Sequence, residues 1–274
     1  MAVKRLGVPP YLYCKPLLHG LEDASDIEIV IDVPARNAIK LREHDLDAAF
    51  LSPIEYARDS SDYVIVRGIA VSSSSATETI TLRFRESLHK IRALAVDPSS
   101  SSEIILARVI LAEEFDINPA IVPVMGSLED MLNKADGALL VGDAALRVPG
   151  EDKSAIDLVD FWNDITGLPF VHGFWCAREQ DMTAEVVSQL QSAKARGVQH
   201  IHALATELPP PAPGLAVAEY LEQFSYDLAE EELEAVREFI KYAYYHGVLP
   251  DVAELALFPL EPGETAADGS VSPN

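Results

Sequence analysis

Short apolar runs alternate with amphipathic stretches along the chain as far as Gln180. Apolar runs of about four to eight residues bounded by Pro, Gly, Ser or Asp predict buried strands, and stretches with a helical period predict helices. The expected strands are residues 4–8, 26–32, 47–51, 63–70, 78–84, 93–96, 119–123, 137–141 and 168–177. Helices are expected over 11–21, 34–43, 103–115 and 157–166, and from residues 53 and 128; later ones over 181–196, 214–223 and 229–247.

One short pattern occurs twice, in residues 47–57 and 136–146. Each copy reads as Asp, a small residue, Ala, two bulky apolar residues, a small-residue break and then a helix start. A turn from a strand into a helix exposes unpaired backbone N–H groups that suit carboxylates and phosphates. Two copies predict two similar lobes that face each other across a cleft holding the substrate.

The order of the elements predicts that the second lobe is inserted into the first. We expect lobe I to comprise residues 1–86 and 178–260, and lobe II residues 87–177. Two crossings, expected at 81–89 and 172–178, would form a hinge that closes around a ligand. Residues 261–274 contain almost nothing to bury and are expected to be disordered. The predicted fold class is α/β, with mixed sheets flanked by helices and a ligand cleft between the lobes.

The formal net charge of −23 narrows the choice of partners. Nucleic acids and anionic membranes require clustered Lys and Arg, so neither is an expected partner. The sequence has no apolar run of the roughly 18 to 20 residues that span a membrane, and its first residues do not read as a leader, which predicts a cytoplasmic protein. The two cysteines, Cys14 and Cys176, form no disulfide framework. Homo-oligomerisation stays open.

The breaks of the two repeats supply the first candidate ligand-binding residues. Ser52 is a ligand donor candidate, and Gly142 with Asp143 occupies the equivalent point of the second copy. Asp143 has three possible roles, namely a helix N-cap, an acid–base group or an acceptor for a hydroxyl. The sequence favours the N-cap.

Hydroxyl-bearing residues supply further candidates. Ser72–Ser75 reads as a flexible surface loop, whereas Thr77 and Thr79 alternate with apolar positions on a strand that should line the cleft. The four serines of 99–102 precede a helix, and we expect Ser99, Ser100 and Ser102 to bind carboxylates, although a helix cap explains one of them equally well.

Histidines provide weaker signals. His172 lies on an apolar strand, where a hydrogen-bonded core residue is a more common role than substrate binding. His200 and His202 fall in a region expected to be helical, where positions two apart do not share a face, so no metal site is expected. No nucleophile motif or nucleotide-binding glycine loop is present in the sequence.

Five segments, taken in order, resemble the chorismate dehydratase family of menaquinone biosynthesis: residues 6–21, 50–58, 139–146, 166–178 and 220–250. The resemblance implies a type II periplasmic-binding-protein-like fold used inside the cell as an enzyme. It also implies a carbon–oxygen lyase that removes water from chorismate, a small dianion, to give 3-[(1-carboxyvinyl)oxy]benzoate, the first step of the futalosine route. No metal or organic cofactor is implied.

The resemblance also assigns two catalytic residues. Tyr13 stands where the family usually carries Asn, and Thr79 where it carries Ser, and both positions are tied to the reaction. Ser101 stands where the family usually carries an Arg, so this carboxylate clamp is absent here. The arginines considered as replacements are Arg83, Arg85 and Arg178.

Three other functions remain as alternatives. A related futalosine-pathway enzyme acting on a dehypoxanthine futalosine-type substrate shares the fold, but the segments around residues 12–17 and 166–170 fit that branch less well. A non-catalytic small-anion-binding protein would normally carry a leader or lipid anchor. The effector-binding half of a transcription regulator would need a basic helix-turn-helix at the N-terminus.

Overall fold

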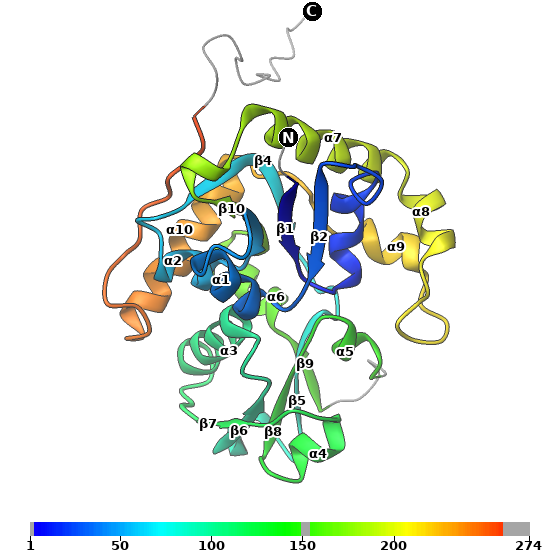
Figure 1. Ribbon diagram of the computed structural model, residues 1–274. Helices are drawn as coiled ribbons and strands as arrows, with labels where there is room; N and C mark the ends of the chain where they lie inside the picture. The colour runs from blue at the N-terminus through cyan, green and yellow to red at the C-terminus, as the bar shows by residue number, and fades with distance from the viewer. Residues whose placement is uncertain (1–2, 149–153, 260–274) are drawn as a thin grey trace, which may run out of the picture.

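The computed structural model describes residues 3–148 and 154–259 and shows two lobes, each built on a five-stranded sheet flanked by helices (Figure 1). The first sheet has the strand order β2-β1-β3-β10-β4. Its strands are β1 (Lys4–Val8), β2 (Ile27–Ile31), β3 (Ala48–Leu51), β4 (Val64–Ser73) and β10 (Phe170–Ala177). Strand β1 pairs in parallel with β2 and β3, whereas β10 runs antiparallel to both β3 and β4.

The second sheet repeats this arrangement with the order β7-β6-β8-β5-β9. Its strands are β5 (Ile80–Phe84), β6 (Ala93–Val96), β7 (Ala120–Pro123), β8 (Gly137–Val141) and β9 (Ala155–Asp157). Strand β6 is parallel to β7 and β8, and β5 is antiparallel to β8 and β9. Both sheets therefore present a row of parallel strand ends from which loops and helix starts project.

Helices connect and cover these sheets. They are η1 (Leu12–Leu18), α1 (Pro34–Arg42), α2 (Pro53–Arg58), η2 (Leu88–Lys90), α3 (Ser101–Glu113), α4 (Leu128–Leu132), α5 (Asp143–Leu146), α6 (Leu158–Thr166), η3 (Glu179–Asp181), α7 (Ala184–Gln199), α8 (Ile201–Glu207), α9 (Val217–Leu221) and α10 (Glu230–Tyr245). Proline at the first position starts α1 and α2, since its missing N–H would be unpaired there. None of the helices in the described part of the chain is long and apolar enough to span a membrane.

Most predicted elements are present, and the differences have local causes. The helix expected over 11–21 is the 3-10 segment η1, which contains Pro16, a residue without the N–H that an α-helix requires. Helix α3 begins at Ser101, two residues before the expected start at Glu103. The tail 261–274 lies outside the described residues.

The expected placement of two strands is wrong. The sequence predicts residues 80–84 in lobe I, but β5 pairs with β8 and β9 in the second sheet. Residues 170–177 were assigned to lobe II, but β10 lies between β3 and β4, where all eight of its residues are buried. Apart from His172 the side chains of this strand are apolar, and such a strand is stable when both of its faces are covered. The sheets are therefore connected by residues 74–79 and 158–169, and not by 81–89 and 172–178.

Helix α7 lies across the outer side of the first lobe (Figure 1) and packs closely on η1. Gly197 makes this contact, because a Cβ atom at this position would stand 1.8 Å from the carbonyl oxygen of Pro16. Glycine lowers helix stability by about 1 kcal/mol relative to alanine. Its presence inside α7 is therefore explained by the close approach of the two backbones.

Candidate functional site

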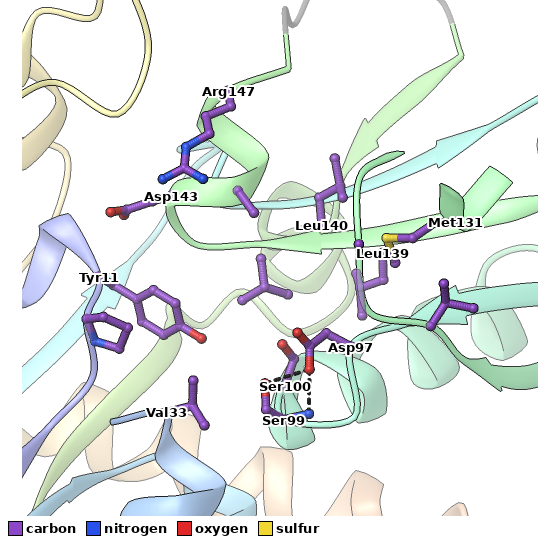
Figure 2. Close-up of a pocket in the computed structure, with 15 residues that line it drawn as sticks. Tyr11, Val33, Asp97, Ser99, Ser100, Met131, Leu139, Leu140, Asp143 and Arg147 are labelled. Carbon is purple, nitrogen blue, oxygen red and sulfur yellow. Dashed lines mark hydrogen bonds between the residues drawn. The ribbon is translucent and has the colours of Figure 1, made fainter. Parts of the chain in front are cut away.

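A cavity of about 310 Å³ lies between the lobes (Figure 2). The first lobe contributes Pro10, Tyr11 and Val33, which follow the carboxyl ends of β1 and β2. The second lobe contributes residues that follow β6, β7 and β8, together with the apolar wall of β8 itself. Ligands of α/β proteins bind at such strand ends, and the volume suits a small molecule.

Tyr11 forms the wall of the cavity on the side of the first lobe. Its ring packs on Gly142, where a Cβ atom would stand 2.4 Å from Tyr11 Cδ1. Gly142 also has φ +63° and ψ −142°, a backbone conformation that side chains strongly disfavour. Only glycine satisfies both conditions, so Gly142 is explained by this contact between the lobes.

Asp143 joins the two lobes directly. It is the first residue of α5, and Gly142 occupies the N-cap position, so the N-cap role favoured by the sequence is wrong. Its Oδ1 accepts a hydrogen bond of 2.9 Å from the backbone N–H of Leu12 in the first lobe. Burial raises the pKa of Asp143, while the Leu12 N–H and the charge of Arg147 act in the opposite direction.

The start of α3 forms the opposite end of the cavity. Ser99 and Ser100, both predicted from the sequence, line it together with Asp97 (Figure 2). Asp97 Oδ1 accepts bonds from the Ser99 N–H at 2.9 Å and the Ser99 hydroxyl at 2.7 Å, which fixes the turn before the helix. Ser102 is fully buried and contacts the first lobe instead of the cavity. Its Oγ accepts a hydrogen bond of 3.1 Å from the Ile54 N–H of α2.

Behind Tyr11 lies a buried polar cluster, which consists of Tyr13, Ser73, Thr79, His172 and Tyr220. The Thr79 hydroxyl is 3.0 Å from the Tyr220 hydroxyl, and Ser73 Oγ is 2.8 Å from His172 Nε2. The Tyr13 ring centroid is 5.2 Å from that of Tyr11 and 5.1 Å from that of His172. Among the described residues that line the cavity, none belongs to this cluster, so Tyr11 stands between the cluster and the cavity.

His172 is a neutral residue of this cluster. Burial lowers its pKa to about 3, so the imidazole carries no positive charge near neutral pH. Its Nδ1 has no hydrogen-bond partner among the described residues. Ser72 and Ser73, expected in a surface loop, form the buried end of β4 instead.

Ser52 and Thr77 are buried away from the cavity lining that the structure describes. Ser52, a candidate ligand donor in the sequence, is the N-cap residue of α2, and its hydroxyl lacks a partner within the described residues. Thr77 and Thr79 precede β5 instead of lying in a strand. The Thr77 N–H donates to Asp157 Oδ2 at 3.2 Å, which holds the first connection between the sheets against the start of α6.

The three arginines considered as carboxylate clamps lie elsewhere. Arg83 is buried and donates to the Val148 carbonyl, and Arg178 donates to two carbonyls of the first lobe and to Asp181. Arg85 lines a separate surface depression of the second lobe. Among the described residues, Arg147 is the cation that lines the cavity, and the sequence analysis missed it together with Tyr11 and Asp97.

Glu103 is a further residue that the sequence analysis missed. It lies in the first turn of α3 and is 3% exposed. Burial raises its pKa from 4.5 to about 7, and the nearby charge of Glu55 adds to this effect. The folded state therefore retains a proton that the unfolded chain releases above pH 4.5, so stability falls as pH rises from 4.5 through 7.

Glu103→Gln is expected to remove this loss of stability. A shift of this size corresponds to about 3 kcal/mol, so the variant should exceed the wild type by about 2 to 3 kcal/mol near pH 8 and match it near pH 4.5. Urea unfolding at both pH values measures the difference. Glu114→Gln, at the exposed end of the same helix, is the control, and an unchanged pH slope in Glu103→Gln would contradict the assignment.

The two lobes and the cleft define the class of protein, and solved structures agree with it. A protein of Archaeoglobus fulgidus has a TM-score of 0.71 at 16% identity, covering 89% of this chain and 98% of that one. The periplasmic aliphatic sulphonate binding protein of Escherichia coli has a TM-score of 0.58 at 18% identity, covering 92% and 95%. A Candida albicans protein described as having the generic periplasmic binding protein fold has a TM-score of 0.61 at 11% identity, covering 96% and 99%. The predicted periplasmic-binding-protein-like fold is confirmed.

The chain belongs to the protein family described as menaquinone biosynthesis, which matches residues 4–245. Two relatives carry the name chorismate dehydratase. The protein of Thermus thermophilus is 25% identical over 256 residues, covering 85% of this chain and 93% of the relative. That of Campylobacter jejuni is 26% identical over 193 residues, covering 69% and 71%. The predicted family is confirmed.

Proposed function

We propose that this protein is a chorismate dehydratase, a carbon–oxygen lyase that converts chorismate to 3-[(1-carboxyvinyl)oxy]benzoate in the futalosine route, in the cytoplasm. The family match carries the proposal, because residues 4–245 include every described residue that lines the cavity between the lobes. The two relatives named chorismate dehydratase support the same reaction.

The chemistry makes modest demands on the protein. One ring C–O bond and one ring C–H bond break, the hydroxide and the proton leave together as water, and the ring becomes aromatic. We assign the proton transfer to a carboxylate of the substrate. Aromatisation supplies the driving force. Loss of water involves no net oxidation or reduction, so the proposal calls for no cofactor. The protein positions a dianion and stabilises the departing hydroxide.

The buried polar cluster supplies the group for the departing hydroxide. Thr79 carries a hydroxyl held by the Tyr220 hydroxyl at 3.0 Å, and the backbone carbonyl of Thr79 accepts the Gly142 N–H at 2.8 Å. Thr79 therefore lies directly behind the contact between Gly142 and Tyr11. In this proposal the Tyr11 ring turns aside when substrate binds, and the ring of the substrate then meets Thr79 and Tyr13.

The test is to incubate the purified protein with chorismate and follow the products by chromatography and mass spectrometry. The expected result is an aromatic product that has lost one water, absent from a heat-denatured sample. Thermal stabilisation by chorismate without any product would favour a small-anion-binding protein. If chorismate neither reacts nor stabilises the protein, another ligand occupies the cleft, and a dehypoxanthine futalosine-type compound is the next candidate.

A further inference from the structure

The charged side chains on the cavity wall differ in whether they have hydrogen-bond or ion-pair partners within the described residues. Asp143 Oδ1 accepts the Leu12 N–H, and Asp97 Oδ1 accepts two bonds from Ser99. Arg147 is exposed at the end of α5, and among the described residues no carboxylate lies within ion-pair distance of its guanidinium group. Within the described residues, therefore, both acids have donors in the protein, whereas Arg147 has no acidic partner.

Arg147 lines the cavity together with Asp143 and Tyr11. Figure 2 shows its guanidinium group directed toward Asp143, above the ring of Tyr11. The charge of Arg147 is close enough to act on the pKa of Asp143, although burial has the larger effect and raises it. Because the chain as a whole carries a charge of −23, an anion can be retained only by a local cation or by directed donors.

We propose that Arg147 binds a carboxylate of the ligand and makes the cleft selective for a small cyclic dicarboxylate over a monocarboxylate. The selectivity for chorismate rests on the proposed function, whereas the binding of a dicarboxylate does not. Guanidinium groups bind carboxylates through two parallel hydrogen bonds, which adds a directional requirement to the attraction between charges.

The remaining wall of the cavity fits the rest of such a ligand. Leu139, Leu140 and Val33 provide apolar surface for a ring. At the far end, Ser99 and Ser100 precede the 13-residue helix α3, whose first N–H groups have no partner within the helix. Asp97 already accepts the Ser99 N–H and hydroxyl, so a second carboxylate at this end would meet the Ser100 hydroxyl and the first N–H groups of α3, while the first meets Arg147.

The test compares two aromatic probes, isophthalate with two carboxylates and benzoate with one, by titration calorimetry. The wild type is expected to bind isophthalate about 30-fold more tightly than benzoate, the size of one hydrogen bond to a charged group in a partly desolvated site. Arg147→Gln should remove most of this preference with little effect on benzoate. Arg147→Lys, which keeps the charge but loses the bidentate geometry, should retain part of it.

Arg85→Gln is the matched control, because Arg85 lies on the surface depression outside the cavity, and this variant should behave as the wild type. The inference would be overturned if Arg147→Gln lost affinity for both probes equally or for neither. It would also be overturned if the wild type showed no preference for isophthalate. Thermal unfolding verifies that each variant is folded. Since no turnover is measured, a protein that binds isophthalate through Arg147 but leaves chorismate unchanged overturns only the proposed function.

Discussion

Replacement of Thr79 by valine is expected to lower kcat for chorismate about 100-fold, with a smaller change in KM. Valine keeps the shape of threonine but removes the hydroxyl that donates to the departing hydroxide, and a positioned donor of this kind contributes about 100-fold or more. The measurement is steady-state formation of the aromatic product. Thr79→Ser keeps the hydroxyl and should retain most of the activity.

Thr81→Val is the matched control for Thr79→Val. Thr81 lies in β5, two residues farther along the chain, and its buried hydroxyl has no partner among the described residues. Removing this hydroxyl should leave both activity and stability unchanged or slightly improved. Wild-type kcat in Thr79→Val would exclude Thr79 from the reaction, and a similar loss in both variants would indicate a general effect on the fold.

Replacement of Gly197 by alanine should destabilise the protein by about 3 kcal/mol. The new Cβ atom would lie 1.8 Å from the Pro16 oxygen and 2.6 Å from its carbonyl carbon. Both atoms belong to the backbone, so the strain cannot be relieved by turning a side chain, and α7 must move away from η1. Overpacking of this kind outweighs the gain of about 1 kcal/mol that alanine brings to a helix.

Urea unfolding measures the loss in Gly197→Ala. Ser192→Ala, on the exposed face of the same helix, is the control and should be neutral or slightly stabilising, because alanine is the better helix former. A gain of stability in Gly197→Ala would show that the two backbones do not approach each other closely in solution.

The positions of nine of the ten described strands follow from the sequence, which misses β9 (Ala155–Asp157), but the places of the strands in the sheets do not. The largely apolar run at 168–177 predicts β10, since a strand buried on both faces carries mostly apolar residues. This strand joins the first sheet because it pairs with β3 and β4. Those strands lie about 100 residues earlier, so the residues around 168–177 carry no information about the pairing. The repeat correctly predicts that β3 leads into α2 and β8 into α5, because a strand that ends in a helix start is a local feature.

The cavity was predictable only in part, for the same reason. Ser99, Ser100 and Asp143 follow strand ends, so their place at the edge of a sheet can be inferred from their position in the sequence. Tyr11 and Arg147 line the cavity because two separate lobes approach each other, which depends on contacts between distant segments. The spacing of residues along the sequence does not predict those contacts.

The position of β10 between β3 and β4 has a consequence for how the chain folds during synthesis. All five strands of the second sheet lie between residues 80 and 157, so this lobe can assemble once that stretch has emerged from the ribosome. Strands β3 and β4 emerge earlier but remain without their shared neighbour until residues 170–177 follow. Early folding of the inserted lobe brings the separated segments of the first lobe together and shortens the loop that must close. The lobe that is synthesised first is therefore completed last.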